Sequence, residues 1–170
     1  MEGNKRRDKI LNQLQKAEKP ISASKFAQQF DVSRQIIVGD IALMRAAGVA
    51  IKATARGYLL QGKRQGKLSQ IVVQHDATQT QTELRIIVEN GGEIVDVIVD
   101  HDIYGELTGN LQIKTIEDIE AFMEKYRSSN ASLLLELTNG IHLHTIAYEN
   151  DETLMKIKAA LLKAGILYQE

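Results

Sequence analysis

The sequence contains no cysteine, a single proline and no long run of apolar residues. Without cysteine, the chain forms no disulfide and offers no thiolate to a metal ion. No stretch is long and apolar enough to span a bilayer, and the basic residues near the N-terminus precede no apolar segment like that of a signal peptide. These absences predict a soluble, cytoplasmic protein that does not bind a membrane.

The charges are distributed unevenly along the chain, although the net charge of the 170 residues is only -1. Residues 1–65 hold 13 basic and 5 acidic side chains, a net charge of +8, whereas residues 66–170 hold 8 and 17, a net charge of -9. The apolar content of 44% suffices for a packed core, and the length fits one large or two small domains. Either the basic half binds the phosphates of a nucleic acid, or both halves are ordinary solvated surfaces.

A helix, a tight turn and a second helix are predicted within residues 22–46. Each helix starts after a serine suited to capping, Ser22 or Ser33, and an apolar residue precedes each serine and can pack against the first turn. Only residues 31–32 separate the two helices. This arrangement is typical of a helix-turn-helix, whose second helix enters the major groove of DNA.

The second helix has two distinct faces when its residues are placed about 100° apart. Its apolar face is predicted to lie in the core and consists of Ile37, Ile41 and Met44. The opposite face combines small side chains with groups that read base edges, since arginine suits guanine and glutamine suits adenine. The residues predicted to bind DNA on this helix are Ser33, Arg34, Gln35, Val38 and Arg45. The alternative is a solvated helix face in a small bundle.

Residues 49–60 have the pattern of two short strands around a turn at Gly57. A hairpin directly after a recognition helix is a wing, and its Lys52 and Arg56 would reach phosphates or the minor groove. The basic segment 61–67 is predicted to be a linker. We therefore expect a mainly α-helical winged helix-turn-helix with a β-hairpin wing over residues 1–62, followed by a second domain over residues 63–170.

Helices and strands alternate in the second half, with hairpins between them. Apolar patterns typical of strands occupy residues 67–75, 93–101, 106–113, 133–137 and 141–148. An Asn-Gly turn joins the last two and predicts a hairpin. Helices are expected to start near Thr80, Thr115 and Asp151, and Thr80 with Glu83 matches a capping box. The pattern predicts an α+β domain in which helices cover one face of a mostly antiparallel sheet.

All four histidines lie in this acidic half. His142 and His144 are two residues apart on a predicted strand, so both rings leave the same face. His75 ends another strand, and Glu83 opens the helix that follows it. Three imidazoles and a carboxylate would complete the shell of a divalent transition metal without sulfur. The alternatives are that Glu83 only caps its helix and that the histidines are half-buried residues of the sheet.

Sequence segments across nearly the whole chain carry a resemblance to a known family. They are Pro-Ile-Ser-Ala at 20–23, Ala-Thr-Ala-Arg-Gly-Tyr at 53–58, Val-Gln-His at 73–75, Glu-Leu at 83–84, Asp-His-Asp-Ile-Tyr-Gly at 100–105 and Gly-Ile-His-Leu-His-Thr at 140–145. Together they resemble the niacin-responsive transcriptional repressors called NiaR, in which a winged helix-turn-helix of biotin-repressor type precedes a three-histidine (3H) domain.

The resemblance implies a metal site, a fold and a set of partners. It implies that His75, Glu83, His142 and His144 bind one divalent transition metal per chain. Three nitrogens and one oxygen suit zinc, nickel, copper or iron, and zinc or nickel is the expected ion. It implies an HPr-like fold for the second domain and a homodimer that binds a double-stranded DNA operator. It further implies repression of niacin uptake or salvage genes, with nicotinic acid as the corepressor.

The effector contacts and the functional class are less constrained. The ring nitrogen of nicotinic acid suits an open position on a metal, which leaves the carboxylate for a donor such as His101 or Tyr104. A second reading makes the metal ion itself the effector. In a third interpretation the protein is an enzyme whose metal site activates water. No nucleophile or general-base motif accompanies this site, so we predict that the protein is not an enzyme. A winged helix that binds protein is disfavoured by the basic charge of the first half.

Overall fold

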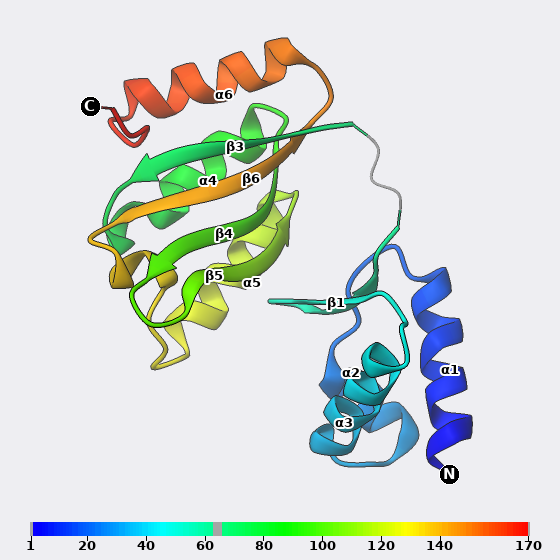
Figure 1. Cartoon of the computed structure of the whole chain (residues 1–170). Helices are drawn as coiled ribbons and strands as arrows, with labels where there is room; N and C mark the ends of the chain where they lie inside the picture. Colours follow the sequence, from blue (N-terminus) through cyan, green and yellow to red (C-terminus); the bar gives the residue numbers. More distant parts are fainter. Residues whose placement is uncertain (1, 63–65, 170) are drawn as a thin grey trace. The chain divides into compact units, whose positions relative to one another are not determined.

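The structure, a computed structural model, describes residues 2–62 and 66–169. The chain divides into two units, Met1–Arg64 and Gln65–Glu170 (Figure 1). The boundary predicted after residue 62 is next to residues 63–65, which lie outside the described residues. No helix among the described residues is long and apolar enough to cross a membrane.

Within the described residues, the N-terminal unit contains three helices followed by a hairpin. The elements are α1 (Gly3–Lys16), α2 (Ala23–Phe30), α3 (Arg34–Ala46), β1 (Ile51–Thr54) and β2 (Gly57–Leu60). Both predicted caps are confirmed, because Ser22 Oγ accepts from the Lys25 amide and Ser33 Oγ accepts from the Ile36 amide. Asp31 ends α2 in a left-handed conformation, with φ at 52°, and so makes the turn before α3 short.

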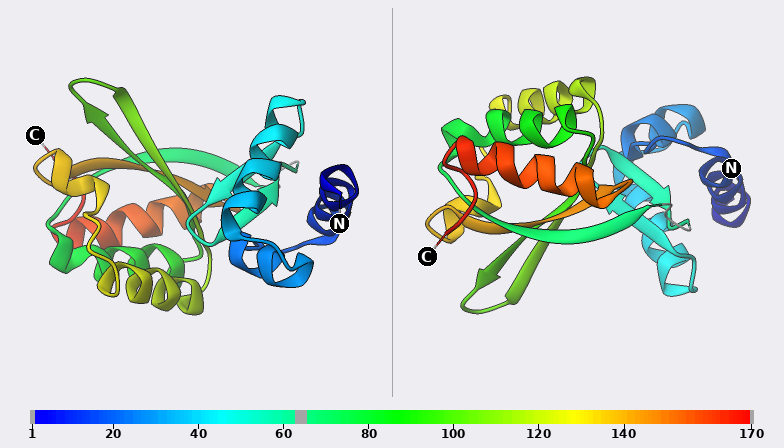
Figure 2. Two further views of the ribbon diagram at one scale, coloured as in Figure 1. Left: turned by 90° about the horizontal axis from the view of Figure 1, so that it is seen from below. Right: turned by 90° about the horizontal axis from the view of Figure 1, so that it is seen from above.

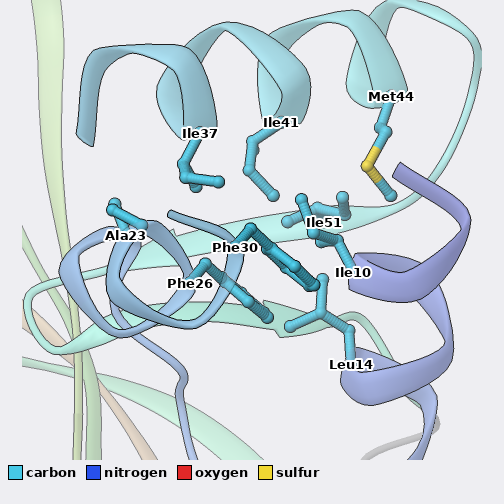
Figure 3. Close-up of a cluster of buried hydrophobic side chains, with 10 residues drawn as sticks. Ile10, Leu14, Ala23, Phe26, Phe30, Ile37, Ile41, Met44 and Ile51 are labelled. Carbon is cyan, nitrogen blue, oxygen red and sulfur yellow. The ribbon is translucent and has the colours of Figure 1, made fainter. Parts of the chain in front are cut away.

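The core of the N-terminal unit lies between the three helices and the hairpin (Figure 3). The apolar face predicted for α3 is buried there, with Ile37, Ile41 and Met44 all nearly inaccessible to solvent. They pack with buried side chains of α1, α2 and β1, namely Ile10, Leu14, Ala23, Phe26, Ala27, Phe30 and Ile51. Burial of this apolar area stabilises the packing of α2 against α3.

Polar contacts also hold the parts of this unit together. Asp40 of α3 is buried and forms ion pairs with Arg6 and Arg7 of α1. The hairpin is joined to the segment between α1 and α2 by backbone hydrogen bonds in both directions between Ile21 and Tyr58. Helix α3 and the hairpin are therefore held in one packed unit by polar contacts as well as by the core.

The C-terminal unit alternates strands and helices. Its elements are β3 (Lys67–Gln74), η1 (Ala77–Gln79), α4 (Thr80–Glu89), β4 (Glu93–His101), β5 (Gly105–Ile113), α5 (Ile116–Arg127), η2 (Leu134–Leu137), β6 (Ile141–Tyr148) and α6 (Asp151–Lys163). Over residues 66–169 four strands form one sheet in the order β3-β6-β4-β5, and each neighbouring pair is antiparallel. The predicted antiparallel α+β architecture is thus confirmed.

Three helices of the described residues cover one face of this sheet, as the two views of Figure 2 show. The middle helix, α4, packs against β4 and lies between α5 and α6, while α6 also packs against β6. Their apolar stripes meet inward-facing side chains of the strands, and the buried residues include Leu84, Ile87, Ile119, Ile146 and Ile157. These buried side chains form the layer between the sheet and the helices.

The predicted hairpin of residues 133–137 and 141–148 is wrong in its first strand. Residues Leu134–Leu137 form the 3-10 helix η2, and only β6 is a strand. The reason is that β6 is a central strand whose two edges are paired with β3 and β4, so no edge remains for a third partner. The Asn-Gly turn does form, with φ of 55° at Asn139 and 86° at Gly140, but it joins η2 to β6.

Candidate functional site

The central strand β6 carries two of the predicted metal ligands. His142 is paired with Val73 of β3, and His144 is paired with Ile71 of β3 and Val97 of β4. Because side chains alternate along a strand, both rings leave the same face, as predicted. Both rings are buried, and they meet edge to face with their centroids 4.8 Å apart. The sheet thus holds two imidazoles side by side beneath the helices.

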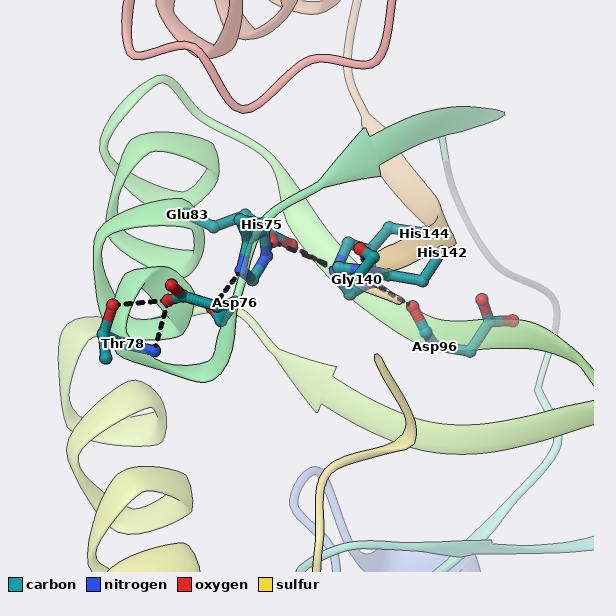
Figure 4. Close-up of polar contacts among 8 residues, drawn as sticks. All are labelled: His75, Asp76, Thr78, Glu83, Asp96, Gly140, His142 and His144. Atoms are coloured by element: carbon teal, nitrogen blue, oxygen red, sulfur yellow. Dashed lines mark hydrogen bonds and ion pairs between the residues drawn. The ribbon is translucent and has the colours of Figure 1, made fainter. Parts of the chain in front are cut away.

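The other two predicted ligands come from the segment that follows β3. His75 lies directly after that strand, and its ring meets the His142 ring with centroids 4.8 Å apart. Glu83 lies one turn inside α4, only 1% exposed, and its carboxylate faces all three histidines (Figure 4). Four side chains from β6, α4 and the end of β3 therefore converge at one buried point.

The capping box predicted between Thr80 and Glu83 is wrong. The N-cap of α4 is Gln79, which makes no side-chain capping hydrogen bond, and Thr80 is already the first helical residue. The short helix η1 precedes α4 and is capped instead by Asp76, whose carboxylate accepts from the Thr78 amide. Glu83 is consequently free of any capping role and is directed toward the histidines.

A backbone carbonyl fixes the orientation of each imidazole ring. His75 Nδ1 lies 2.6 Å from the Asp76 carbonyl oxygen, His142 Nδ1 lies 2.9 Å from that of Gly140, and His144 Nδ1 lies 2.7 Å from that of Asp96. Since a carbonyl oxygen only accepts, each Nδ1 carries the proton when the ring is neutral. Each Nε2 then presents a lone pair, which is the arrangement that a metal-binding histidine needs.

The Nε2 atoms of the three rings surround the Glu83 carboxylate. His142 Nε2 lies 3.3 Å from Glu83 Oε2; His75 Nε2 is in contact with the same oxygen, and His144 Nε2 contacts Oε1. The ligand atoms of His75, Glu83 and His142 all lie within 4.8 Å of one another. Three nitrogen donors and one carboxylate in this space fit a divalent transition metal.

Several buried polar atoms of this group also fit a metal ion. Within the described residues, His75 Nε2 and both carboxylate oxygens of Glu83 are buried, and beyond the contacts within this group they have no hydrogen-bond partner. Buried polar atoms are normally satisfied, and a carboxylate in particular is costly to bury. A cation bound among these atoms would satisfy them, so the residues present fit a metal ion. We refer to His75, Glu83, His142 and His144 as the His/Glu cluster.

The charges of the His/Glu cluster are strongly coupled. Burial by itself raises the pKa of the Glu83 carboxyl, but the adjacent His144 and His142 more than offset it, so that the pKa is held well below its usual range. Burial by itself lowers the pKa of His144, but the Glu83 carboxylate reverses this and raises the pKa above the ordinary value for histidine. The site therefore favours a negative carboxylate next to positive charge.

A small cavity lies against the His/Glu cluster, with a volume of about 40 Å³. Apart from the cluster, its walls are almost entirely apolar: Leu84, Val97, Leu111, Phe122, Leu133, Leu134 and Leu135. Thr80 of α4 is the remaining lining residue. Leu133 and Leu134 are only half-buried, so the cavity approaches the surface beside η2. The sequence did not identify this cavity, because α5 and η2 are brought to it only by the tertiary fold.

The structure does not bring His101 and Tyr104 to the His/Glu cluster. They lie at the turn between β4 and β5, where His101 Nδ1 accepts from the amides of Ile103 and Tyr104. Val97 is the β4 residue paired with His144, and His101 is four residues further, or roughly 13 Å at about 3.3 Å per residue. Neither side chain lines the cavity, and Tyr104 is 73% exposed.

The residues predicted to read bases lie at different depths on α3. Arg34, Gln35 and Arg45 are exposed, as a groove-facing residue must be. Ser33 is exposed as well, and its hydroxyl is used to cap the helix. Val38 is half-buried and packs against the hydrophobic core, so it lies at the margin of the exposed face rather than at its centre.

The two residues predicted to contact phosphates lie on the hairpin. Lys52 is part of β1, and Arg56 lies in the turn between β1 and β2; both are half-buried. The turn is built by Thr54, whose hydroxyl donates to the Gly57 carbonyl and accepts from the Arg56 amide. The hairpin thus forms where the sequence predicted it, directly after α3.

Both units match families of known proteins. Residues 6–59 match a family of helix-turn-helix domains, and residues 68–170 match the 3H domain. Over 161 residues, which cover 95% of the chain and 92% of the relative, the sequence is 39% identical to the "Probable transcription repressor NiaR" of Thermotoga maritima. Over 172 residues, covering 99% of the chain and 96% of the relative, it is 36% identical to the "Transcription repressor NadR" of Bacillus subtilis. An uncharacterised protein of Methanothermus fervidus is 34% identical over 112 residues, 17% of its length.

Proposed function

Because this chain belongs to the NiaR/NadR family of transcription repressors, we propose that it represses genes of niacin uptake or salvage with nicotinic acid as the corepressor. The named relatives are repressors and the chain has their helix-turn-helix domain, so it is a DNA-binding regulator and not an enzyme. Its place of action is then the cytoplasm, where a repressor meets its operator. The C-terminal domain takes the part of the effector domain and has an HPr-like fold.

The proposed operator contacts are divided between α3 and the hairpin. Arg34 and Gln35, exposed on the first turn of α3, read base edges in the major groove. The hairpin acts as a wing, and Lys52 and Arg56 contact the phosphate backbone. The excess of basic residues in the first 65 positions supports this assignment, since counterion release drives binding to DNA. Two chains act as a homodimer, so that two such surfaces meet two half-sites.

In the effector domain, the His/Glu cluster holds one divalent transition metal per chain, with zinc or nickel as the expected ion. The observation that carries this assignment is the set of three Nδ1–carbonyl contacts, which aim three Nε2 atoms at the Glu83 carboxylate. A bound ion would supply positive charge and an open coordination position for an acidic effector. Glu83 and the three histidines would hold the ion.

In the proposed function, the metal ion is part of the effector site and nicotinic acid is the effector. In an alternative, the metal ion is itself the effector. In the alternative, the protein is a metal-sensing repressor whose affinity for DNA responds to the ion alone. The cavity beside the His/Glu cluster favours an organic effector, because its apolar walls can pack against an aromatic ring but supply no ligand to an ion.

A DNA-binding titration separates these functions. The operator is first selected from random DNA in the presence of nicotinic acid, and affinity is then measured by fluorescence anisotropy with metal-loaded and metal-stripped protein. We expect nicotinic acid to tighten binding only in the metal-loaded protein, and by linkage DNA should tighten nicotinic acid binding by the same factor. The proposal is refuted if stripped, folded protein keeps the full response to nicotinic acid. A response to the metal with none to nicotinic acid would establish the alternative.

A further inference from the structure

The buried hydroxyl of Thr80 is a polar group that the His/Glu cluster does not use. Thr80 is the first residue of α4 and is 6% exposed. It lies one helical turn before Glu83, so both side chains leave the same side of the helix. Its Oγ1 is buried and has no hydrogen-bond partner among the described residues. Such a group in a folded protein calls for an explanation, because nearly all buried hydroxyls are satisfied.

The position of Thr80 in the cavity provides that explanation. It is one of the residues lining the 40 Å³ cavity and, among the described residues, the only polar lining residue outside the His/Glu cluster. The remaining walls are leucine, valine and phenylalanine side chains. A ligand larger than this space can enter it and extend toward the surface beside η2, and it needs an apolar body with polar atoms at two places, one beside the cluster and one beside Thr80. A six-membered aromatic ring with an acidic substituent has this form.

The charges around the cavity determine whether the carboxylate of an aromatic acid faces the His/Glu cluster or Thr80. No lysine or arginine is among the described residues that line it, so a carboxylate placed on the Thr80 side would lack a positive partner. Among the described lining residues, positive charge is offered on the side of the His/Glu cluster, where a bound cation would lie. The acid group therefore faces the cluster. Thr80 is left to donate a hydrogen bond to an uncharged acceptor on the ring.

We propose that Thr80 determines the specificity of the effector site by donating a hydrogen bond to the ring nitrogen of a pyridine carboxylate whose acid group faces the His/Glu cluster. This inference rests on the proposed function and adds to it the orientation of the ligand. It reverses the orientation expected from the sequence, in which the ring nitrogen faced the metal. Thr80 thereby distinguishes a pyridine ring from a benzene ring of the same shape.

The test combines two ligands with three proteins, wild type and two variants, and is measured by calorimetric titration of the zinc-loaded, full-length chain. The ligands are nicotinic acid and benzoic acid, which differ only in the ring nitrogen. The variants are Thr80→Val, which keeps the shape of the side chain, and Thr80→Ser, which keeps the hydroxyl. We expect wild type to bind nicotinic acid roughly tenfold more tightly than benzoic acid, and Thr80→Val to bind both with about equal affinity. Thr80→Ser should restore most of the preference.

Two measurements keep a structural effect apart from a direct contact. Zinc content, read by elemental analysis, should be equal in all three proteins, and a variant that loses zinc together with both ligands would contradict a direct contact. Equal weakening of nicotinic and benzoic acid by Thr80→Val, or no change in the preference, overturns the inference while leaving the proposed function standing. Failure of wild type to bind nicotinic acid at all would refute both.

Discussion

Replacing Gly140 by alanine should damage the metal site without touching any of its ligands. Gly140 has φ at 86°, a conformation that residues with a side chain rarely adopt. A Cβ built on it would lie 2.5 Å from the carbonyl oxygen of His75, which is far inside van der Waals contact. Two backbone segments would have to separate, and they are the segments that carry His75 and His142.

The magnitude follows from three parts. A positive φ costs an alanine about 1–2 kcal/mol, and relief of the overlap adds about 1–3 kcal/mol as in an overpacked core. Gly140 also orients the site, since its carbonyl oxygen accepts from the His75 amide at 3.3 Å and lies 2.9 Å from His142 Nδ1. Loss of such outer contacts typically weakens metal binding by about 10–100-fold.

Gly105→Ala is the matched control. Gly105 also has a positive φ, 70°, but a Cβ there meets no atom within 4 Å. It should lose only the conformational part, about 1–2 kcal/mol of unfolding free energy, and keep its zinc affinity. Urea unfolding and a competitive zinc titration with a chromophoric chelator measure the two effects. If Gly140→Ala were no worse than Gly105→Ala in both assays, the account of how the His/Glu cluster is positioned would be wrong.

Three further predictions concern the DNA-binding domain and the charges of the site. Asp40→Ala should lower the unfolding free energy by about 3–5 kcal/mol, because it removes the buried carboxylate that is ion-paired with Arg6 and Arg7 of α1; the exposed Asp8→Ala should be nearly neutral by the same urea titration. Arg34→Ala should weaken binding to the selected operator by about 1–3 kcal/mol and relax the preference for one base, and an unchanged anisotropy titration would refute the groove assignment. In metal-free protein the raised pKa of His144 gives stability that is lost as pH rises above 6.5 through its folded pKa, whereas the lowered pKa of Glu83 gives stability that is lost only as pH falls below 4.5. The unfolding free energy of the metal-free protein should therefore fall as the pH rises above 6.5. Zinc affinity should rise over the same range, because His144 releases its proton. If neither the unfolding free energy nor the zinc affinity changed with pH, the coupling between His144 and Glu83 would be contradicted.

Features encoded by neighbouring residues could be predicted from the sequence. The serine caps at Ser22 and Ser33 are local, since a side chain bonds an amide three residues ahead. The shared face of His142 and His144 follows from the period of a strand alone. The same holds for the apolar stripe of α3, because helical spacing fixes which side chains enter the core.

Features that depend on distant partners could not be predicted in this way. The segment Leu134–Leu137 has the composition of a strand, but the topology leaves β6 no free edge to pair with it. Thr80 and Glu83 have the spacing of a capping box, but the histidines compete for the carboxylate, and they reach it only once β3 and β6 are paired. The carbonyls of Gly140 and Asp96 leave no mark in the sequence, because any residue offers the same acceptor.

The metal content of the purified protein tests the central claim most directly. Wild type, a His142→Ala/His144→Ala double variant and His101→Ala are each loaded with zinc, dialysed against buffer and analysed for zinc per chain, with circular dichroism to confirm folding. We expect one zinc ion per chain in wild type and in His101→Ala, whose ring lies outside the His/Glu cluster. The double variant should retain almost none. Undiminished zinc in a folded double variant would contradict the assignment of the cluster as the metal site.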